Sequence, residues 1–251
     1  MSSSEWLIKQ YEGDYMFSMR IDKIIRHSDD VSTLFFSSRL RSYPGQFIML
    51  NLPRYEEIPL SLSSPNSVTV RAVGETTYAL IRLSAGEIVG IRGPFGKPFT
   101  PTDGKALLVA GGIGAAPLYY LHDYLKRRGA EVKVLFGARK AEELVWKDRF
   151  SVLMVATDDG SEGLRGTVID LLKEEELQQY DRIYVCGPEE MLRKAFTHLK
   201  EKEVLGKAEF SLERYMKCGI GVCGTCILED GSRVCAEGPV FSGKDLEGVE
   251  F

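Results

Sequence analysis

The first hundred residues alternate between apolar and polar positions with the period of a β-strand. Tyr15, Phe17, Met19 and Ile21 alternate with the polar residues Ser18, Arg20 and Asp22, which is typical of a strand with one buried face. Similar runs follow at residues 33–36, 47–52, 68–73 and 87–92, with turn signals at residues 43–45 and 64–66. Short strands at this spacing predict an all-β barrel or sandwich.

The pattern changes at residues 103–104. Residues 106–110 are a continuous apolar run, as expected for a fully buried parallel strand. The apolar face of the helical segment that follows, which ends at Gly129, is formed by Leu118, Leu121, His122 and Leu125. Three more strand-and-helix units begin at residues 132–136, 152–156 and 182–185. This alternation predicts a parallel sheet with helices on both faces.

Length and charge limit the classes of function. A chain of 251 residues suggests one to three domains. The net charge of -4 gives no reason to expect a nucleic acid or an anionic membrane surface as partner. The N-terminus lacks the basic and apolar regions of a signal peptide, and no run of about 18 apolar residues is present. We therefore expect a cytoplasmic protein without a membrane span.

Four of the five cysteines fall near the C-terminus, at Cys218, Cys223, Cys226 and Cys235. The opening C-x4-C-x2-C is the spacing associated with plant-type [2Fe–2S] binding, in which four thiolates hold two irons. The intervening glycines, Gly219, Gly221 and Gly224, would let the backbone approach the cluster closely. A turn at residues 229–232 predicts a short hairpin that returns Cys235 to the loop.

Two alternatives remain for these thiols. One is a structural zinc site, although zinc ribbons prefer two C-x2-C pairs and only one is present. The other is a pair of disulfides, which the absence of an export signal disfavours. The fifth cysteine, Cys186, is not expected to bind the metal, because the other four already form a set.

A glycine-rich turn follows the strand at residues 106–110 and opens a helix, which is a nucleotide-binding context. Its glycines would allow a pyrophosphate to approach, and the helix N-terminus would supply amides and a positive dipole end. The dinucleotide fingerprint is imperfect, because Pro117 replaces its third glycine. No acidic residue clearly follows the second strand, where Arg139 could instead meet a 2′-phosphate.

Residues 43–47, 58–61 and 93–96, and later 111–117 and 184–191, resemble in content and order the segments of ferredoxin-reductase-like flavoproteins. The resemblance implies that the barrel binds FAD through Ile58, Pro59, Leu60, Ser61, Thr69, Val70, Arg71, Thr76 and Thr77. It implies that NAD is bound by Gly111, Gly112, Gly114, Ala115, Pro117, Cys186, Gly187 and Pro188. The family usually has Arg at the position of Ile58, so Arg54 or Arg71 is expected to replace its pyrophosphate contact.

Residues 211–221 and 233–241 closely resemble the electron-transfer subunits of type B dihydroorotate dehydrogenases. This resemblance implies an FAD-binding antiparallel β-barrel at 1–102, an NAD(P)-binding α/β domain at 103–203 and a [2Fe–2S] module at 204–251. It implies electron flow from a separate FMN-containing catalytic subunit, through the cluster and FAD, to NAD+ in pyrimidine biosynthesis. It also implies a heterotetramer with two chains of each type, and no dihydroorotate-converting residue in this chain.

Three apolar residues of the module, Ile220, Val222 and Phe241, are candidates for the interface with that subunit or for packing around the cluster. Two other functions remain. The chain could be the flavin and iron–sulfur subunit of a ferredoxin:NADP oxidoreductase or of a sulfhydrogenase. It could also be a zinc-stabilised binding module without redox chemistry.

Overall fold

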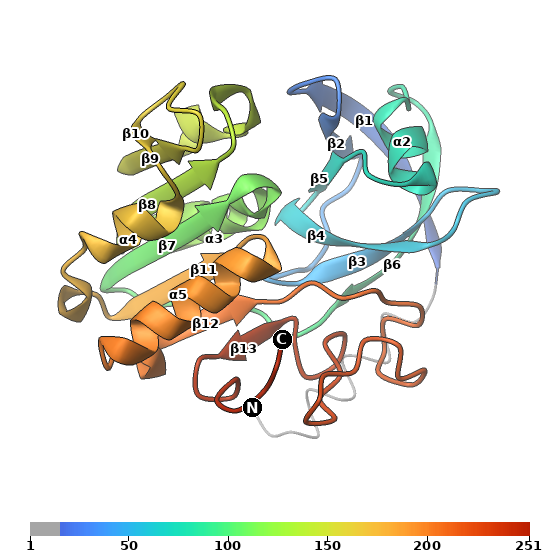
Figure 1. The fold of residues 1–251 in the computed structure, drawn as a ribbon. Helices are drawn as coiled ribbons and strands as arrows, with labels where there is room; N and C mark the ends of the chain where they lie inside the picture. The colour runs from blue at the N-terminus through green and yellow to red at the C-terminus, as the bar shows by residue number, and fades with distance from the viewer. Residues whose placement is uncertain (1–15) are drawn as a thin grey trace.

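Two β-sheets organise residues 16–251, which the computed structural model describes (Figure 1). The first is a closed barrel in the order β1-β2-β5-β4-β3-β6, in which every neighbouring pair is antiparallel. Its strands are β1 (Phe17–Arg26), β2 (Val31–Phe36), β3 (Phe47–Asn51), β4 (Ile58–Ser64), β5 (Ser67–Arg71) and β6 (Ile88–Phe95). The predicted barrel is therefore confirmed, with Tyr15 lying outside the described residues.

The barrel forms because alternate side chains of these strands point inward. Met19 and Ile21 of β1 are buried while their neighbours are exposed, as the two-residue period requires. Two elements of the barrel region were not predicted. Strand β4 has too many serines for an apolar pattern, and helix α2 (Glu75–Ile81) is a short insertion between β5 and β6.

The second sheet has the order β10-β9-β8-β7-β11-β12-β13. Its strands are β7 (Lys105–Gly111), β8 (Glu131–Ala138), β9 (Leu153–Thr157), β10 (Leu164–Arg165), β11 (Arg182–Cys186), β12 (Ala208–Ser211) and β13 (Val240–Ser242). All neighbours are parallel except β13, which runs antiparallel to β12. The predicted parallel sheet is confirmed, and it continues past residue 203 into the last two strands.

Helices cover both faces of this sheet (Figure 1). They are α3 (Ala115–Arg127), α4 (Val168–Lys173) and α5 (Glu189–Glu201). The apolar residues of α3 pack into one core cluster with β7 and β8, whereas those of α4 and α5 pack into another. No helix of the described residues is long and apolar enough to cross a membrane.

The helix expected after β8 is not formed, so that prediction is wrong. Two single 3-10 turns, Ala141–Glu143 and Lys147–Arg149, occupy the connection. Trp146 between them has a φ of 71°, a left-handed conformation that an α-helix cannot contain.

Residues 212–239 leave the sheet after β12 and return to it at β13, and they contain the four clustered cysteines. This excursion packs against the end of the barrel. A Cβ added at Gly219 would lie 2.8 Å from Cγ of Met49 in β3. Phe47, Met49 and Phe95 of the barrel share one core cluster with Met216 of the tail. The expected hairpin before Cys235 is present, with a bridge between Ile227 and Arg233.

Candidate functional site

The four clustered cysteines lie in one loop but differ in exposure. Cys226 and Cys235 are buried, Cys218 is intermediate and Cys223 is exposed. All five cysteines of the chain are free thiols, and the fifth, Cys186, is buried at the end of β11. The disulfide alternative therefore finds no support in the positions of the sulfur atoms.

The thiols of this loop are arranged as two pairs. Cys223 lies near the thiol of Cys218, which contributes to lowering its pKa. The backbone N–H of Cys235 donates to Cys226 Sγ at 3.4 Å, and the thiol of Cys226 contributes to raising the pKa of Cys235. Among residues 16–251, no three His, Cys, Asp or Glu side chains are grouped so that they could hold one metal ion. The loop thus offers an outer and an inner pair of sulfur ligands.

Backbone amides are directed at these sulfur atoms. The N–H of Gly221 donates to Cys235 Sγ at 3.1 Å, and the N–H of Val222 donates to Cys218 Sγ at 3.4 Å. Gly221 has a φ of 79°, which a residue with a Cβ rarely adopts. Such amides stabilise negative charge on sulfur, because hydrogen bonding to an ionised form favours it.

The two pairs also differ in acidity. Hydrogen bonds from Thr225, whose hydroxyl lies 3.2 Å from the sulfur, and from Cys218 lower the pKa of Cys223 to about 6. Burial, together with the neighbouring Cys226, raises the pKa of Cys235. Cys223 is therefore ready to act as a thiolate near neutral pH, while metal binding at Cys235 must displace a proton.

A cleft of about 380 Å³ lies where the barrel, the second sheet and the tail meet, a volume typical of ligand sites. The residues predicted to bind FAD or NAD that line it are Ile58, Pro59, Leu60, Ser61, Thr69, Val70, Arg71, Thr77, Gly114 and Pro117. Segments that are far apart in the sequence thus form one concave surface between the two sheets.

Thr76 and Thr77 have separate places at the start of α2. Thr76 is buried, and its hydroxyl donates to the carbonyl of Glu56 at 3.1 Å. Thr77 accepts the N–H groups of Val73 and Gly74 at 2.9 Å each, so it caps the helix while facing the cleft. Thr76 therefore supports the wall of the cleft and does not line it.

Arg71 is the cleft residue with unmet hydrogen-bonding capacity. Its Nε and Nη2 atoms are buried and make no hydrogen bond. The nearest carboxylates, those of Asp30 and Glu143, are 3.7 Å away. Arg54, the other expected substitute for the missing arginine at Ile58, is exposed in the turn after β3 and does not line the cleft. Of the two arginines, Arg71 is the one placed to meet a phosphate group in the cleft, because its guanidinium fork matches phosphate oxygens.

The two predicted NAD turns are packed against each other at the carboxyl edge of the second sheet. A Cβ added at Gly114 would lie 2.5 Å from the carbonyl oxygen of Cys186, and one at Gly187 would lie 3.0 Å from Cα of Gly111. The remaining predicted NAD contacts, which belong to these turns but do not line the cleft, are Gly111, Gly112, Ala115, Cys186, Gly187 and Pro188. The glycine at 114 is thus required by the protein's own packing.

Sequence reasoning missed the wall of the cleft that the tail contributes. This wall is formed by Leu212, Glu213, Arg214, Met216 and Pro239. The segment had been singled out for its resemblance, but no periodicity or motif indicated where its side chains point. Arg214 is held by an ion pair of 3.2 Å to Glu189, at the start of α5.

Trp146 was also missed. Its ring stacks on Tyr119 of α3, with centroids 4.9 Å apart and an interplanar angle of 3°. Its Nε1 donates to the Thr69 hydroxyl of the barrel at 3.3 Å. This side chain therefore joins the two sheets beside the cleft.

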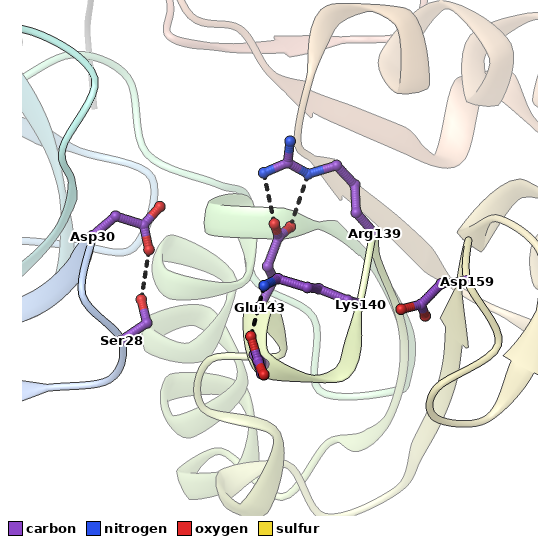
Figure 2. Close-up of a pocket in the computed structure, with 7 residues that line it drawn as sticks. Ser28, Asp30, Arg139, Lys140, Glu143 and Asp159 are labelled. Carbon is purple, nitrogen blue, oxygen red and sulfur yellow. Dashed lines mark hydrogen bonds and ion pairs between the residues drawn. The ribbon is translucent and has the colours of Figure 1, made fainter.

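A second hollow, shown in Figure 2, lies at the edge of the second sheet, where the turn between β1 and β2 faces it. Arg139, the candidate for a 2′-phosphate contact, donates to Glu143 through Nη2 at 2.6 Å and through Nε at 3.2 Å. Lys140 is paired with Glu142 at 2.6 Å. Both cations are thus already matched by carboxylates, and Asp159 adds a further negative charge to the lining.

Of the three apolar interface candidates, Val222 is 77% exposed, while Ile220 is partly buried against the core. Phe241 is only 4% exposed and belongs to the core beside β12, so its assignment to an interface is wrong. Ile227, which had not been considered, is 52% exposed on the same loop.

Comparison with known proteins agrees with this geometry. Residues 213–247 match the family model of the iron–sulfur cluster binding domain of dihydroorotate dehydrogenase B, and residues 108–196 match an oxidoreductase NAD-binding domain. Among solved structures, the chain is similar to one described as an NADH-dependent reduced ferredoxin-NADP oxidoreductase involved in flavin-based electron bifurcation. The TM-score is 0.81 at 30% identity, over 92% of this chain and 89% of that one.

Curated relatives carry a consistent description. A protein of Archaeoglobus fulgidus is 58% identical over 92% of this chain and 99% of its own length. One of Methanocella arvoryzae is 44% identical over 91% of each chain. Both are described as probable electron transfer subunits of NAD+-dependent dihydroorotate dehydrogenase B. With a barrel and a dinucleotide-type sheet that meet the tail at one cleft, and with a four-thiol loop in that tail, the chain belongs to the family of dihydroorotate dehydrogenase B electron transfer subunits.

Proposed function

We propose that this chain conducts electrons between a subunit that oxidises dihydroorotate and NAD+, using a [2Fe–2S] cluster and FAD. The observation that carries the proposal is the continuity between the thiol loop and the cleft. Met216 is buried, lines the cleft and lies two residues before Cys218. FAD is suited to such a place because it exchanges single electrons with a cluster and electron pairs with a nicotinamide.

The cluster ligands in this proposal are Cys218, Cys223, Cys226 and Cys235. The outer pair, Cys218 with Cys223, would bind one iron, and the inner pair would bind the other. Two pairs of thiols suit two irons better than a single zinc ion, which requires four ligands around one centre. The amides of Gly221 and Val222 would then offset the negative charge of the bound thiolates.

For FAD, the cleft offers the polar contacts Arg71 and Ser61 beside its apolar lining. Arg71 would bind the pyrophosphate, since its buried N–H groups have no acceptor of their own. Ser61 and Pro59 of β4 would lie against the flavin, and Thr77 would contact FAD at the capped start of α2. Ile58 would contribute an apolar contact in place of the usual arginine.

For NAD, the turn after β7 and the turn containing Cys186, Gly187 and Pro188 would enclose the pyrophosphate and the nicotinamide. Gly114 and Pro117 reach the cleft, so a nicotinamide entering there would face the flavin site. The carboxylates of the second hollow favour NAD over NADP, because Glu143 is already paired with Arg139 and a 2′-phosphate would be repelled by the negative charges.

We further propose that the exposed face of the cluster loop, with Val222 and Ile227, docks on an FMN-containing catalytic subunit. A heterotetramer with two chains of each type would place one cluster at each such contact. Dihydroorotate itself would be converted by the partner, as no catalytic residue for that reaction is assigned in this chain.

The test is anaerobic purification followed by absorption and EPR spectra, iron and acid-labile sulfide analysis, and titration with NADH. We expect about one FAD and two irons per chain, with both centres reduced by NADH. A colourless protein that contains zinc would overturn the proposal. Co-purification with an FMN protein would support the partner assignment, whereas recovery of a hydrogenase would favour the sulfhydrogenase alternative.

A further inference from the structure

Two adjacent glutamates, placed directly before β4, connect the predicted flavin strand to the cluster loop. Glu57 accepts two hydrogen bonds from Arg92 of β6, from Nε at 2.9 Å and from Nη2 at 2.6 Å. The two side chains are only 19% and 15% exposed. This is a bidentate and largely buried ion pair, a geometry that holds both partners rigidly.

The same arginine reaches the cluster loop. Its third nitrogen, Nη1, donates to the backbone carbonyl of Cys218 at 3.1 Å. The neighbouring Glu56 accepts a short hydrogen bond from the hydroxyl of Tyr215, three residues before that cysteine. The first cysteine of the loop is thus fastened to the segment that leads into Ile58 and Ser61.

Close packing supports these polar contacts. Gly219, the residue after Cys218, fits against Met49 so tightly that a Cβ would lie 2.8 Å from Cγ of that side chain. The Arg92 guanidinium lies 5.7 Å from the centre of the Phe95 ring. The loop therefore cannot move away from the barrel without breaking the hydrogen bonds Arg92–Cys218 and Tyr215–Glu56 and the contact of Gly219 with Met49.

We propose that Arg92 and Glu57 are positioning residues for electron exchange, which fix the cluster relative to the flavin and set the cluster's reduction potential. This inference rests on the proposed function. With both cofactors bound, FAD would accept a hydride from NADH and give up its two electrons one at a time through the cluster.

The sign of the effect follows from charge. The cluster becomes more negative by one unit when it is reduced, and charges and hydrogen bonds nearby set its potential. The positive charge of Arg92, which donates to the backbone carbonyl of Cys218, favours the reduced form of the cluster. The negative charge of Glu57, which is paired with Arg92, favours the oxidised form. Because the pair is mostly shielded from water, neither charge is fully screened.

The experiment measures the cluster's potential in the full-length chain, purified anaerobically with its cofactors, by EPR-monitored redox titration. We expect Arg92→Gln to lower the potential by about 59 mV, a tenfold change in the one-electron equilibrium. Glu57→Gln should raise the potential. Arg92→Lys should keep it close to that of the wild type, and the double variant should lie between the two single glutamine variants.

Stopped-flow mixing with NADH provides the second measurement. Flavin reduction should keep its rate in all variants, while cluster reduction should slow by up to about tenfold in Arg92→Gln, following its less favourable equilibrium. The matched control is Arg20→Gln, which removes an exposed arginine paired with Asp22 on the same barrel and should change neither quantity.

Shifts of the same sign in Arg92→Gln and Glu57→Gln, or no shift in either, would overturn the inference. So would loss of the cluster in both Arg92→Lys and Glu57→Gln, which would assign the pair to folding alone. A wild-type chain without FAD or iron would instead refute the proposed function, so the two failures are distinguishable.

Discussion

Arg71 shows how the environment of a single residue can support its proposal as a cofactor contact. A buried guanidinium that lacks acceptors is costly to a protein, and here two of its nitrogen atoms have none. The carboxylates of Asp30 and Glu143 are close enough to offset its charge but not to form hydrogen bonds. The site is therefore preorganised for an anion that brings its own oxygen atoms.

Arg71→Gln should weaken FAD binding by about 10- to 100-fold, since hydrogen bonds to charged groups contribute about 1.5–3 kcal/mol each. Fluorescence titration of the FAD-depleted chain would measure the change in affinity. Arg54→Gln is the matched control, because this arginine is exposed outside the cleft, and it should bind FAD normally. Equal affinities in the two variants would place the pyrophosphate elsewhere.

Cys226→Ser should remove an inner ligand and abolish the cluster's visible and EPR signals while FAD remains bound. Cys226 is almost fully buried, so water cannot easily replace the lost sulfur. Cys186→Ala is the control, because this thiol is at the end of β11 and outside the two pairs. A normal cluster spectrum in Cys226→Ser would refute the proposed ligand set.

At the residue scale, the sequence predicted which types of residue form the site better than it predicted which residues contact one another. The cysteine spacing is local, so the four thiols could be predicted to share one loop. The choice between Arg54 and Arg71 could not be made, because it depends on how the barrel faces the second sheet. The role of Trp146 in joining the two sheets could not be predicted either. Its partners, Tyr119 and Thr69, are distant from it in the chain.

At the scale of elements, the N-terminus of helix α4 is determined by residues that are close together in the sequence. Asp170 accepts hydrogen bonds from the backbone N–H and the hydroxyl of Thr167, each at 2.8 Å. These bonds, the backbone one first, lower the pKa of Asp170. This is the reciprocal capping arrangement expected at a helix N-terminus.

The pH dependence of this cap has a definite sign. A carboxylate whose pKa is lowered in the folded state adds stability above its unfolded pKa of 3.8, and this stability is lost as the pH falls through the folded value. Asp170→Asn should therefore lower the free energy of unfolding by about 1 kcal/mol at pH 7. Urea unfolding at matched pH should show this difference shrinking below about pH 4. A difference that is constant down to pH 3 would contradict the role of the charge.

Periodicity predicted elements well where burial is one-sided or complete, as in β1 and β7. It failed at the connection between β8 and β9, where helical spacing continues but Trp146 adopts a left-handed conformation. That conformation is stabilised by stacking on Tyr119, a contact from another part of the fold. Strand β4 was not predicted, because its serines interrupt the apolar pattern. Its burial is provided by the neighbouring strands of the barrel.

At the scale of the whole molecule, the cluster loop is anchored at both ends in a sheet whose strands contain none of the four clustered cysteines. Strands β12 and β13 pair with each other, and β12 pairs with β11. Removing iron with a chelator should therefore loosen only the loop. Hydrogen exchange should lose protection in residues 218–236 and keep it in Ala208–Ser211 and Val240–Ser242. Loss of protection throughout the second sheet would show instead that the metal stabilises the entire fold.

The pairing of Ser211 with Val240 has a practical consequence for protein engineering. The 28 residues from 212 to 239 begin and end on adjacent strands, so the ends of the excised segment already lie side by side. A tight two-residue reverse turn could rejoin them. The shortened chain would lack one wall of the cleft and all four cysteines of the cluster loop. It would therefore allow the hydride chemistry of a flavin enzyme to be studied without its iron–sulfur electron carrier. Conversely, a loop of another redox type could be grafted between the same two anchor points.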